Sequence, residues 1–289
     1  MNSDLFKEFI KEIKPNNRDK VYAWRTAVGL QDVDNLKPSS YLINLATRNI
    51  KGEITLKEIS NLIDAFYKEK PQDNKNQRIE EADKVSLRIV SMLSEKSFSF
   101  TPNEYILIHR KLFTGIYNHA GVIRDYNITK NEDILNGETV TYGSFLELKE
   151  ALYYDFAKEK KFSYQNLSTN EVIKHLALFI SNLWQNHIFG EGNTRTTAVF
   201  LIKYLRKLGL NVTNDTFANN SKYFRNSLVR ANYNDYKKGI YENREYLELF
   251  LRKLLLNEEN PLKNQELHIS WLFFNIKPDI DVKKSNIEV

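Results

Sequence analysis

Apolar residues recur at intervals of three and four along most of this 289-residue chain, with polar residues between them. This spacing places the apolar side chains on one face of an α-helix. Capping residues precede several stretches, and Thr55 and Thr101 are each followed three residues later by a glutamate. We expect a mainly α-helical fold, with helices over residues 4–14, 21–30, 41–50, 55–67, 79–93, 101–116, 144–156, 171–184, 196–208, 215–232 and 245–256. Residues 71–77 are polar and are the best candidate for a linker.

Residues 124–143 have a different pattern. Residues 127–129 and 139–142 are rich in β-type side chains, and Asn136-Gly137 lies between them. Asn-Gly favours the two-residue turn of a β-hairpin, because both residues tolerate a positive φ. The pattern predicts an exposed hairpin, which by itself could be an ordinary surface feature.

Composition narrows the range of functions. The absence of cysteine excludes disulfides, thiolate metal sites and a thiol nucleophile. No apolar run reaches membrane-spanning length, and the first residues do not resemble a signal peptide, so we expect a cytoplasmic protein with no membrane partner. The net charge of +5 is spread among interspersed acidic residues. This favours a solvated surface over a nucleic-acid partner.

The segment with the most chemistry is 187–195, with the sequence HIFGEGNTR. A glycine-bearing loop that opens a helix presents free N–H groups and the positive end of the helix dipole, which attract phosphate. Glu191 offers hard oxygen ligands to a divalent cation, and Arg195 can bind phosphate oxygens through its fork of donors. His187 has an ordinary pKa near neutrality and suits proton abstraction from a hydroxyl. The segment therefore predicts phosphoryl chemistry.

These nine residues resemble the signature of Fic proteins, H-x-F-x-[DE]-G-N-x-R, in which six positions are fixed. The resemblance extends upstream through residues 108–113 and 117–124 and covers roughly 100–210. It implies a Fic-type helical bundle with one β-hairpin flap, preceded by an N-terminal helical region. The flap would hold the target segment by adding a strand beside it. Its target-binding residues would be Asn127, Ile128, Thr129, Val140, Thr141 and Tyr142.

Most Fic enzymes transfer AMP from ATP to a hydroxyl side chain of a protein. By this resemblance His187 would be the base, Glu191 would bind Mg²⁺, and Phe189 would fix the loop. The nucleotide and its phosphates would be bound by Gly190, Gly192, Asn193, Thr194 and Arg195. Asn232, Tyr233 and Tyr236 lie where the family often forms its adenine pocket. The implied partners are ATP, Mg²⁺ and a target protein, which can include the chain itself.

Two departures from the family pattern matter. Many Fic proteins have a second arginine three residues after the first, where this chain has Ala198, and Ile188 replaces a frequent proline. The first departure leaves the donor open. The alternatives are a Fic-fold transferase that uses UTP, GTP or a phosphocholine nucleotide, an enzyme that removes AMP, and a catalytically silent binding scaffold.

Many Fic proteins are also restrained by a glutamate on an inhibitory helix. Thr47, Lys51 and Gly52 have the spacing of that motif, but lysine replaces the glutamate. We therefore expect the N-terminal helices to pack beside the site without a Glu–Arg pair. The predicted organisation is an N-terminal helical region at 1–77, a catalytic core with flanking helices at 78–260, and a tail at 261–289. The sequence leaves open the target protein, the biological role and homo-oligomerisation.

Overall fold

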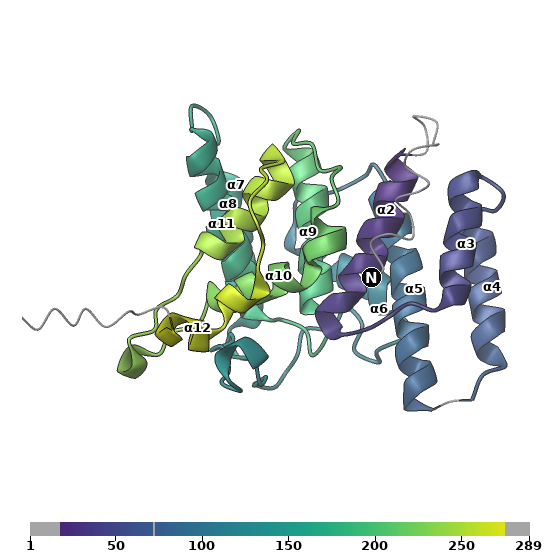
Figure 1. Cartoon of the computed structure of the whole chain (residues 1–289), viewed down its shortest axis with the longest axis horizontal. Helices are drawn as coiled ribbons and strands as arrows, with labels where there is room; N and C mark the ends of the chain where they lie inside the picture. Colours follow the sequence, from purple (N-terminus) through teal and green to yellow (C-terminus); the bar gives the residue numbers. More distant parts are fainter. Residues whose placement is uncertain (1–17, 72, 275–289) are drawn as a thin grey trace, which may run out of the picture.

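A computed structural model describes residues 18–71 and 73–274, and these residues form a bundle of helices (Figure 1). The helix expected at 4–14 lies outside the described residues. The elements in chain order are α2 Arg18–Gly29, η3 Leu30–Asp34, α3 Ser40–Lys51, α4 Leu56–Lys68, α5 Asn74–Ser94, α6 Pro102–Phe113, η4 Asp133–Leu135, α7 Leu148–Lys161, α8 Thr169–Asn186, α9 Asn193–Lys207, α10 Thr216–Arg230, η5 Tyr236–Lys238, α11 Glu245–Leu256, η6 Asn264–Leu267 and α12 Ile269–Phe274, where η denotes a 3₁₀ helix.

Local capping chemistry explains where several helices begin. The side chain of Ser39 accepts a hydrogen bond from the Leu42 N–H at the start of α3. Thr55 and Glu58 form a reciprocal capping box on α4, and Ser168 with Glu171 forms another on α8. These bonds satisfy N–H groups that a helix leaves unpaired in its first turn. Among the described residues, the expected helices are confirmed.

Some boundaries differ from the expectation. The side chain of Asp73 caps α5, which begins at Asn74, so the linker expected at 71–77 is shorter and the expected boundary after residue 77 falls within a helix. Helix α7 begins at Leu148, after a turn, and not at residue 144. The first difference arises because polar residues close to the start of α5 are part of its cap and its first turn.

Helix α9 is the centre of the bundle. It contacts α5, α6, α8 and η3, and every residue from Asn193 to Leu205 is buried. Phe200 lies in an aromatic cluster with Phe98, Phe100, Tyr105, Phe156 and Phe179. Because the functional segment leads directly into α9, the core fixes the position of that segment.

The N-terminal helices join this core and do not form a detached unit. Helix α2 packs along α5 and also contacts α10, while α3 and α4 lie at one end of the molecule (Figure 1). At the other end of the sequence, η6 contacts α10 and α12 contacts η4. Each helix in residues 18–71 and 73–274 is too short or too polar to span a lipid bilayer.

The β-hairpin expected within 124–143 is not confirmed, because the described residues contain no strand. The turn chemistry is as expected: Asn136 and Gly137 have φ values of 54° and 88°, and the Glu138 N–H donates to the Leu135 carbonyl at 3.1 Å. However, the arm before the turn winds into η4, whose Ile134 and Leu135 are buried. Burial of these two side chains favours a helical turn over an extended arm.

The aromatic cluster around Phe200 provides a test of this core. We expect Phe200→Ala to lower the free energy of unfolding by about 3–5 kcal/mol, because the substitution leaves a cavity in a closely packed region. Urea denaturation followed by circular dichroism measures this change. Leu146→Ala is the control, since that side chain is 77% exposed. A loss below about 1 kcal/mol for Phe200→Ala would contradict the central position of α9.

Candidate active site

His187 ends α8 in an unusual backbone conformation. Its φ of 47° and ψ of 53° lie in the left-handed region, which turns the chain sharply toward the loop before α9. Arg124 holds this turn: its Nε donates to the His187 carbonyl at 2.7 Å, and its backbone N–H donates to the Ile188 carbonyl at 2.9 Å. A further Arg124 nitrogen donates to the Gly143 carbonyl at 2.6 Å. One arginine thus joins the loop to both ends of the 124–143 segment.

The imidazole of His187 is covered in this structure. Only 4% of the residue is exposed, and the rings of Tyr142 and Trp184 lie 4.3 and 5.1 Å from its ring, centroid to centroid. Burial lowers the pKa of His187 well below its ordinary value, and the positive charge of Lys130 lowers it further, against a smaller opposing effect of the Trp184 carbonyl. His187 is therefore held as a neutral imidazole, the form that accepts a proton.

The loop itself is held by Asn193. The Asn193 side chain accepts from the Phe189 N–H at 3.1 Å and donates to the Phe189 carbonyl at 2.7 Å. Phe189 is fully buried and stacks on His109, with ring centroids 3.7 Å apart. Phe189 thus fixes the loop, as the resemblance implied, whereas the Asn193 amide bonds the loop backbone.

Two glycines allow this loop to pack closely. Gly192 has a φ of 76°, and a Cβ there would lie 2.4 Å from the ring of Phe113. A Cβ on Gly190 would lie 2.7 Å from the Tyr126 hydroxyl. Thr194 follows in the first turn of α9, where its hydroxyl accepts from Trp184 Nε1 at 3.0 Å. The loop therefore opens directly onto the N-terminus of α9, which favours an anion.

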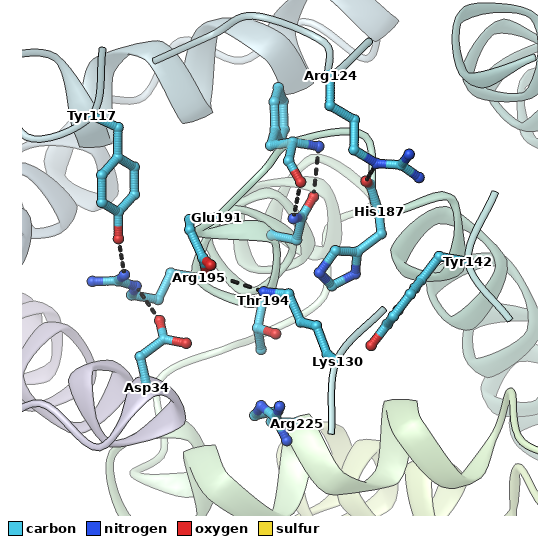
Figure 2. A network of polar contacts seen from close by, with 12 residues as sticks. Asp34, Tyr117, Arg124, Lys130, Tyr142, His187, Glu191, Thr194, Arg195 and Arg225 are labelled. Carbon is cyan, nitrogen blue, oxygen red and sulfur yellow. Dashed lines mark hydrogen bonds and ion pairs between the residues drawn. The ribbon is translucent and has the colours of Figure 1, made fainter. Parts of the chain in front are cut away.

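Glu191 is the accessible carboxylate of the segment. Its side chain is 54% exposed and pairs with Lys130 Nζ at 3.1 Å (Figure 2). Mg²⁺ is commonly bound by one or two carboxylates together with substrate phosphates, and Glu191 offers hard oxygen ligands of this kind. A cation at Glu191 would compete with Lys130 for this carboxylate.

Arg195 lies in a buried cage of acidic and polar side chains. Its guanidinium is 1% exposed and lies 2.6 Å from Glu81 Oε1 and 2.8 Å from Asp34 Oδ2. It also donates to Gln31 and to the Tyr117 hydroxyl, both at 3.1 Å. Glu81 of α5 thus forms a Glu–Arg pair with Arg195, the first arginine of the motif. The expectation concerned a different pair, between a glutamate of the N-terminal helices and the second arginine position, where this chain has Ala198.

A cavity of about 890 Å³ adjoins the loop. Its lining includes Glu191, Asp34 and Tyr117, together with Arg225 and Lys222 of α10. Figure 2 shows Arg225, Lys130 and Thr194 around a common space. The cavity is large enough for a nucleotide-sized ligand, for which binding sites typically measure several hundred cubic ångströms.

The remaining predicted residues lie in several places. In the segment expected to be a flap, Val140 is buried, Ile128 is half-buried, and Asn127, Thr129 and Thr141 are exposed. Tyr142 covers His187, as described above. Asn232 and Tyr233 are buried, Tyr236 is 72% exposed, and none of the three lines the 890 Å³ cavity.

The residues with inhibitory-motif spacing lie away from the loop. Thr47 and Lys51 are on α3, where the Thr47 hydroxyl donates to the Ile43 carbonyl, and Gly52 ends that helix with a φ of 82°. Helix α3 packs on α2 and α4. The carboxylates that reach Arg195 come instead from η3 and α5.

Sequence reasoning did not identify Asp34, Glu81, Lys130 or Arg225 as site residues. They lie 30 to 161 positions from Arg195 in sequence, and each is an ordinary charged residue in its local context. Their roles depend on how α5, α9 and α10 pack, so the chain contained no local signal for them.

Comparisons with known proteins support the motif. Residues 99–205 match the model of the Fic/DOC family. The comparison with curated proteins gave no match, and neither did the comparison with solved structures. The matched region begins before α6 and ends within α9, so it contains the whole loop. Residues 99–205 of this chain are therefore identified as a Fic/DOC family domain.

Proposed function

We propose that this chain is a protein adenylyltransferase, which transfers AMP from ATP to a Ser, Thr or Tyr hydroxyl of a target protein and releases pyrophosphate. The family assignment supports a Fic-type enzyme. The observation that carries the proposal is the arrangement at the start of α9. There a neutral imidazole and an accessible carboxylate flank a helix N-terminus, beside a cavity of about 890 Å³.

In the proposed reaction, the target hydroxyl oxygen attacks the α-phosphorus of ATP. His187 takes the hydroxyl proton, a bond forms between that oxygen and phosphorus, and the bond to the oxygen that bridges the α- and β-phosphates breaks. Pyrophosphate leaves with that bridging oxygen. The backbone N–H groups at the start of α9 stabilise the charge on the phosphate, so positioning and electrostatics supply most of the acceleration.

Glu191 is the residue that would hold Mg²⁺. The ion supplies charge neutralisation for the phosphate oxygens when bound. Once Glu191 engages a cation, Lys130 loses its partner and becomes available to a phosphate. Before substrate arrives, Lys130 and Glu191 neutralise each other.

Access to His187 requires a movement of the 124–143 segment. Tyr142 covers the imidazole, and the Tyr142 hydroxyl donates to Glu132 Oε1 at 3.2 Å. We propose that a target segment displaces Tyr142, so that its own hydroxyl faces the imidazole. Water is excluded until the target binds, which limits hydrolysis of ATP.

We expect His187→Ala to lower transfer from α-labelled ATP by at least about 100-fold, because the general base is lost. Label on the chain or on an added acceptor, resolved by gel, measures transfer. His175→Gln on the same helix is the control and should keep activity. Equal labelling by the wild type and His187→Ala would contradict the assignment, and labelling from γ-labelled ATP would indicate a kinase.

The lowered pKa of His187 predicts how kcat/KM for AMP transfer depends on pH. A free imidazole titrates near 6.5, so a buried one with a lower pKa stays neutral as the pH falls from 8 to about 6. We expect kcat/KM for transfer to remain nearly constant over this range. Lys130→Gln removes a nearby positive charge, so it should raise the pKa and move the acid limb to higher pH. A wild-type profile with an apparent pKa at or above 6.5 would refute the neutral-base assignment.

The carboxylates around Arg195 are expected to limit the activity of the enzyme, because they occupy the guanidinium. Arg195 must exchange a carboxylate before it can bind a phosphate, so we expect Glu81→Gln to raise the rate of transfer several-fold at low ATP concentration. Glu80→Gln is the matched control, because Glu80 lies next in sequence and pairs with Lys84 instead, at 2.7 Å. An unchanged or lower rate in Glu81→Gln would mean that Arg195 has only a structural role.

A further inference from the structure

Some of the cationic side chains near the 890 Å³ cavity are already paired with carboxylates of the protein. Arg195 is enclosed by two carboxylates, and Lys130 pairs with Glu191. ATP carries several negative charges on its phosphates. The loop and the N-terminus of α9 together supply few free positive charges for them, so a cation from elsewhere is needed.

Three cations line the cavity: Arg78, Lys222 and Arg225. The Arg78 side chain is 54% exposed, and Lys222 is also exposed, so solvent weakens the attraction that either exerts on an anion. The Arg225 side chain is only 24% exposed. An ion pair with a partly buried guanidinium is stronger because it is less screened.

Arg225 also has donors to spare. Its Nη1 pairs with Glu132 Oε2 at 2.7 Å, and among the described residues this is its one contact with a carboxylate. A guanidinium carries five N–H donors in a rigid fork that matches phosphate oxygens. Glu132 is 1% exposed and therefore fixes the direction of the Arg225 side chain. The fork is held in place before a ligand arrives, which lowers the entropic cost of binding.

The charge of Arg225 acts on the loop as well as on the cavity. The positive charge of Arg225 lowers the pKa of His187, although less than burial, Lys130 and Arg124 do. It also opposes the rise in the pKa of Tyr142. Figure 2 shows Arg225 across the common space from Glu191. The guanidinium therefore approaches the site from α10, opposite the loop.

We propose that Arg225 is a phosphate-binding residue of this site, which binds the polyphosphate tail of the donor from the α10 side. This inference rests on the proposed function for the identity of the donor. The phosphate binds the donors of Arg225 that Glu132 leaves free, and its negative charge weakens the attraction between Arg225 and Glu132. Because Glu132 also accepts from the Tyr142 hydroxyl, binding at Arg225 loosens the residue that covers His187.

The test measures binding of inorganic tripolyphosphate and of ATP by isothermal titration calorimetry. We expect Arg225→Ala to weaken both at least about tenfold, because charge-assisted bonds to phosphate are lost. Arg225→Lys keeps the charge without the fork and should be intermediate. Lys222→Ala is the matched control, because Lys222 is on the same helix and lines the same cavity, and its expected change is below about twofold.

The variant Glu132→Gln distinguishes a direct loss of phosphate binding from a structural effect of losing the Arg225–Glu132 pair. It removes the carboxylate and keeps Arg225, so tripolyphosphate should bind as tightly as to the wild type or more tightly. The same weakening in Glu132→Gln as in Arg225→Ala would show a structural effect and overturn the inference. It would also be overturned by a change below about twofold in Arg225→Ala, by equal losses in Lys222→Ala, or by no binding of tripolyphosphate to the wild type.

The outcomes also separate this inference from the proposed function. AMP transfer that persists unchanged in Arg225→Ala would reject the inference and leave the adenylyltransferase standing. Tripolyphosphate binding that depends on Arg225, without transfer from any nucleotide in the wild type, would support the phosphate site and reject the transferase.

Discussion

The burial of one guanidinium constrains the whole arrangement around the motif. Arg195 lies on the central helix α9, and its charge would cost several kcal/mol if it were buried without partners. Asp34 of η3 and Glu81 of α5 supply those partners, and the Phe113 ring lies 4.8 Å from the guanidinium carbon. Three separate parts of the chain therefore have to close over the start of α9. This contact ties the N-terminal helices to the candidate active site.

The other reactive groups of the site also contact residues of the protein itself. Lys130 holds Glu191, Tyr142 covers His187, and Glu132 holds Arg225. Substrate binding would then be an exchange of internal contacts for contacts with phosphate, cation and target. Such an exchange costs little for the half-exposed Lys130–Glu191 pair and much more for the buried Arg195 cage.

The sequence predicted the parts of this molecule that depend on local patterns. Helix positions followed from apolar spacing and from caps such as Thr55, and the loop before α9 followed from its motif. The hairpin was not confirmed, because tertiary burial of Ile134 and Leu135 favours a 3₁₀ turn in one arm. Glu81 and Arg225 could not be foreseen, since their importance arises only from the packing of distant helices.

The central claim is that this site moves an adenosine monophosphate group onto a hydroxyl. Intact-mass spectrometry after incubation with Mg²⁺, a mixture of nucleoside triphosphates and acceptor proteins tests it most directly. The account predicts a covalent mass gain on this chain or an acceptor that equals one AMP moiety. A gain that corresponds to phosphate or to another nucleotide, or no gain on any protein, would contradict it.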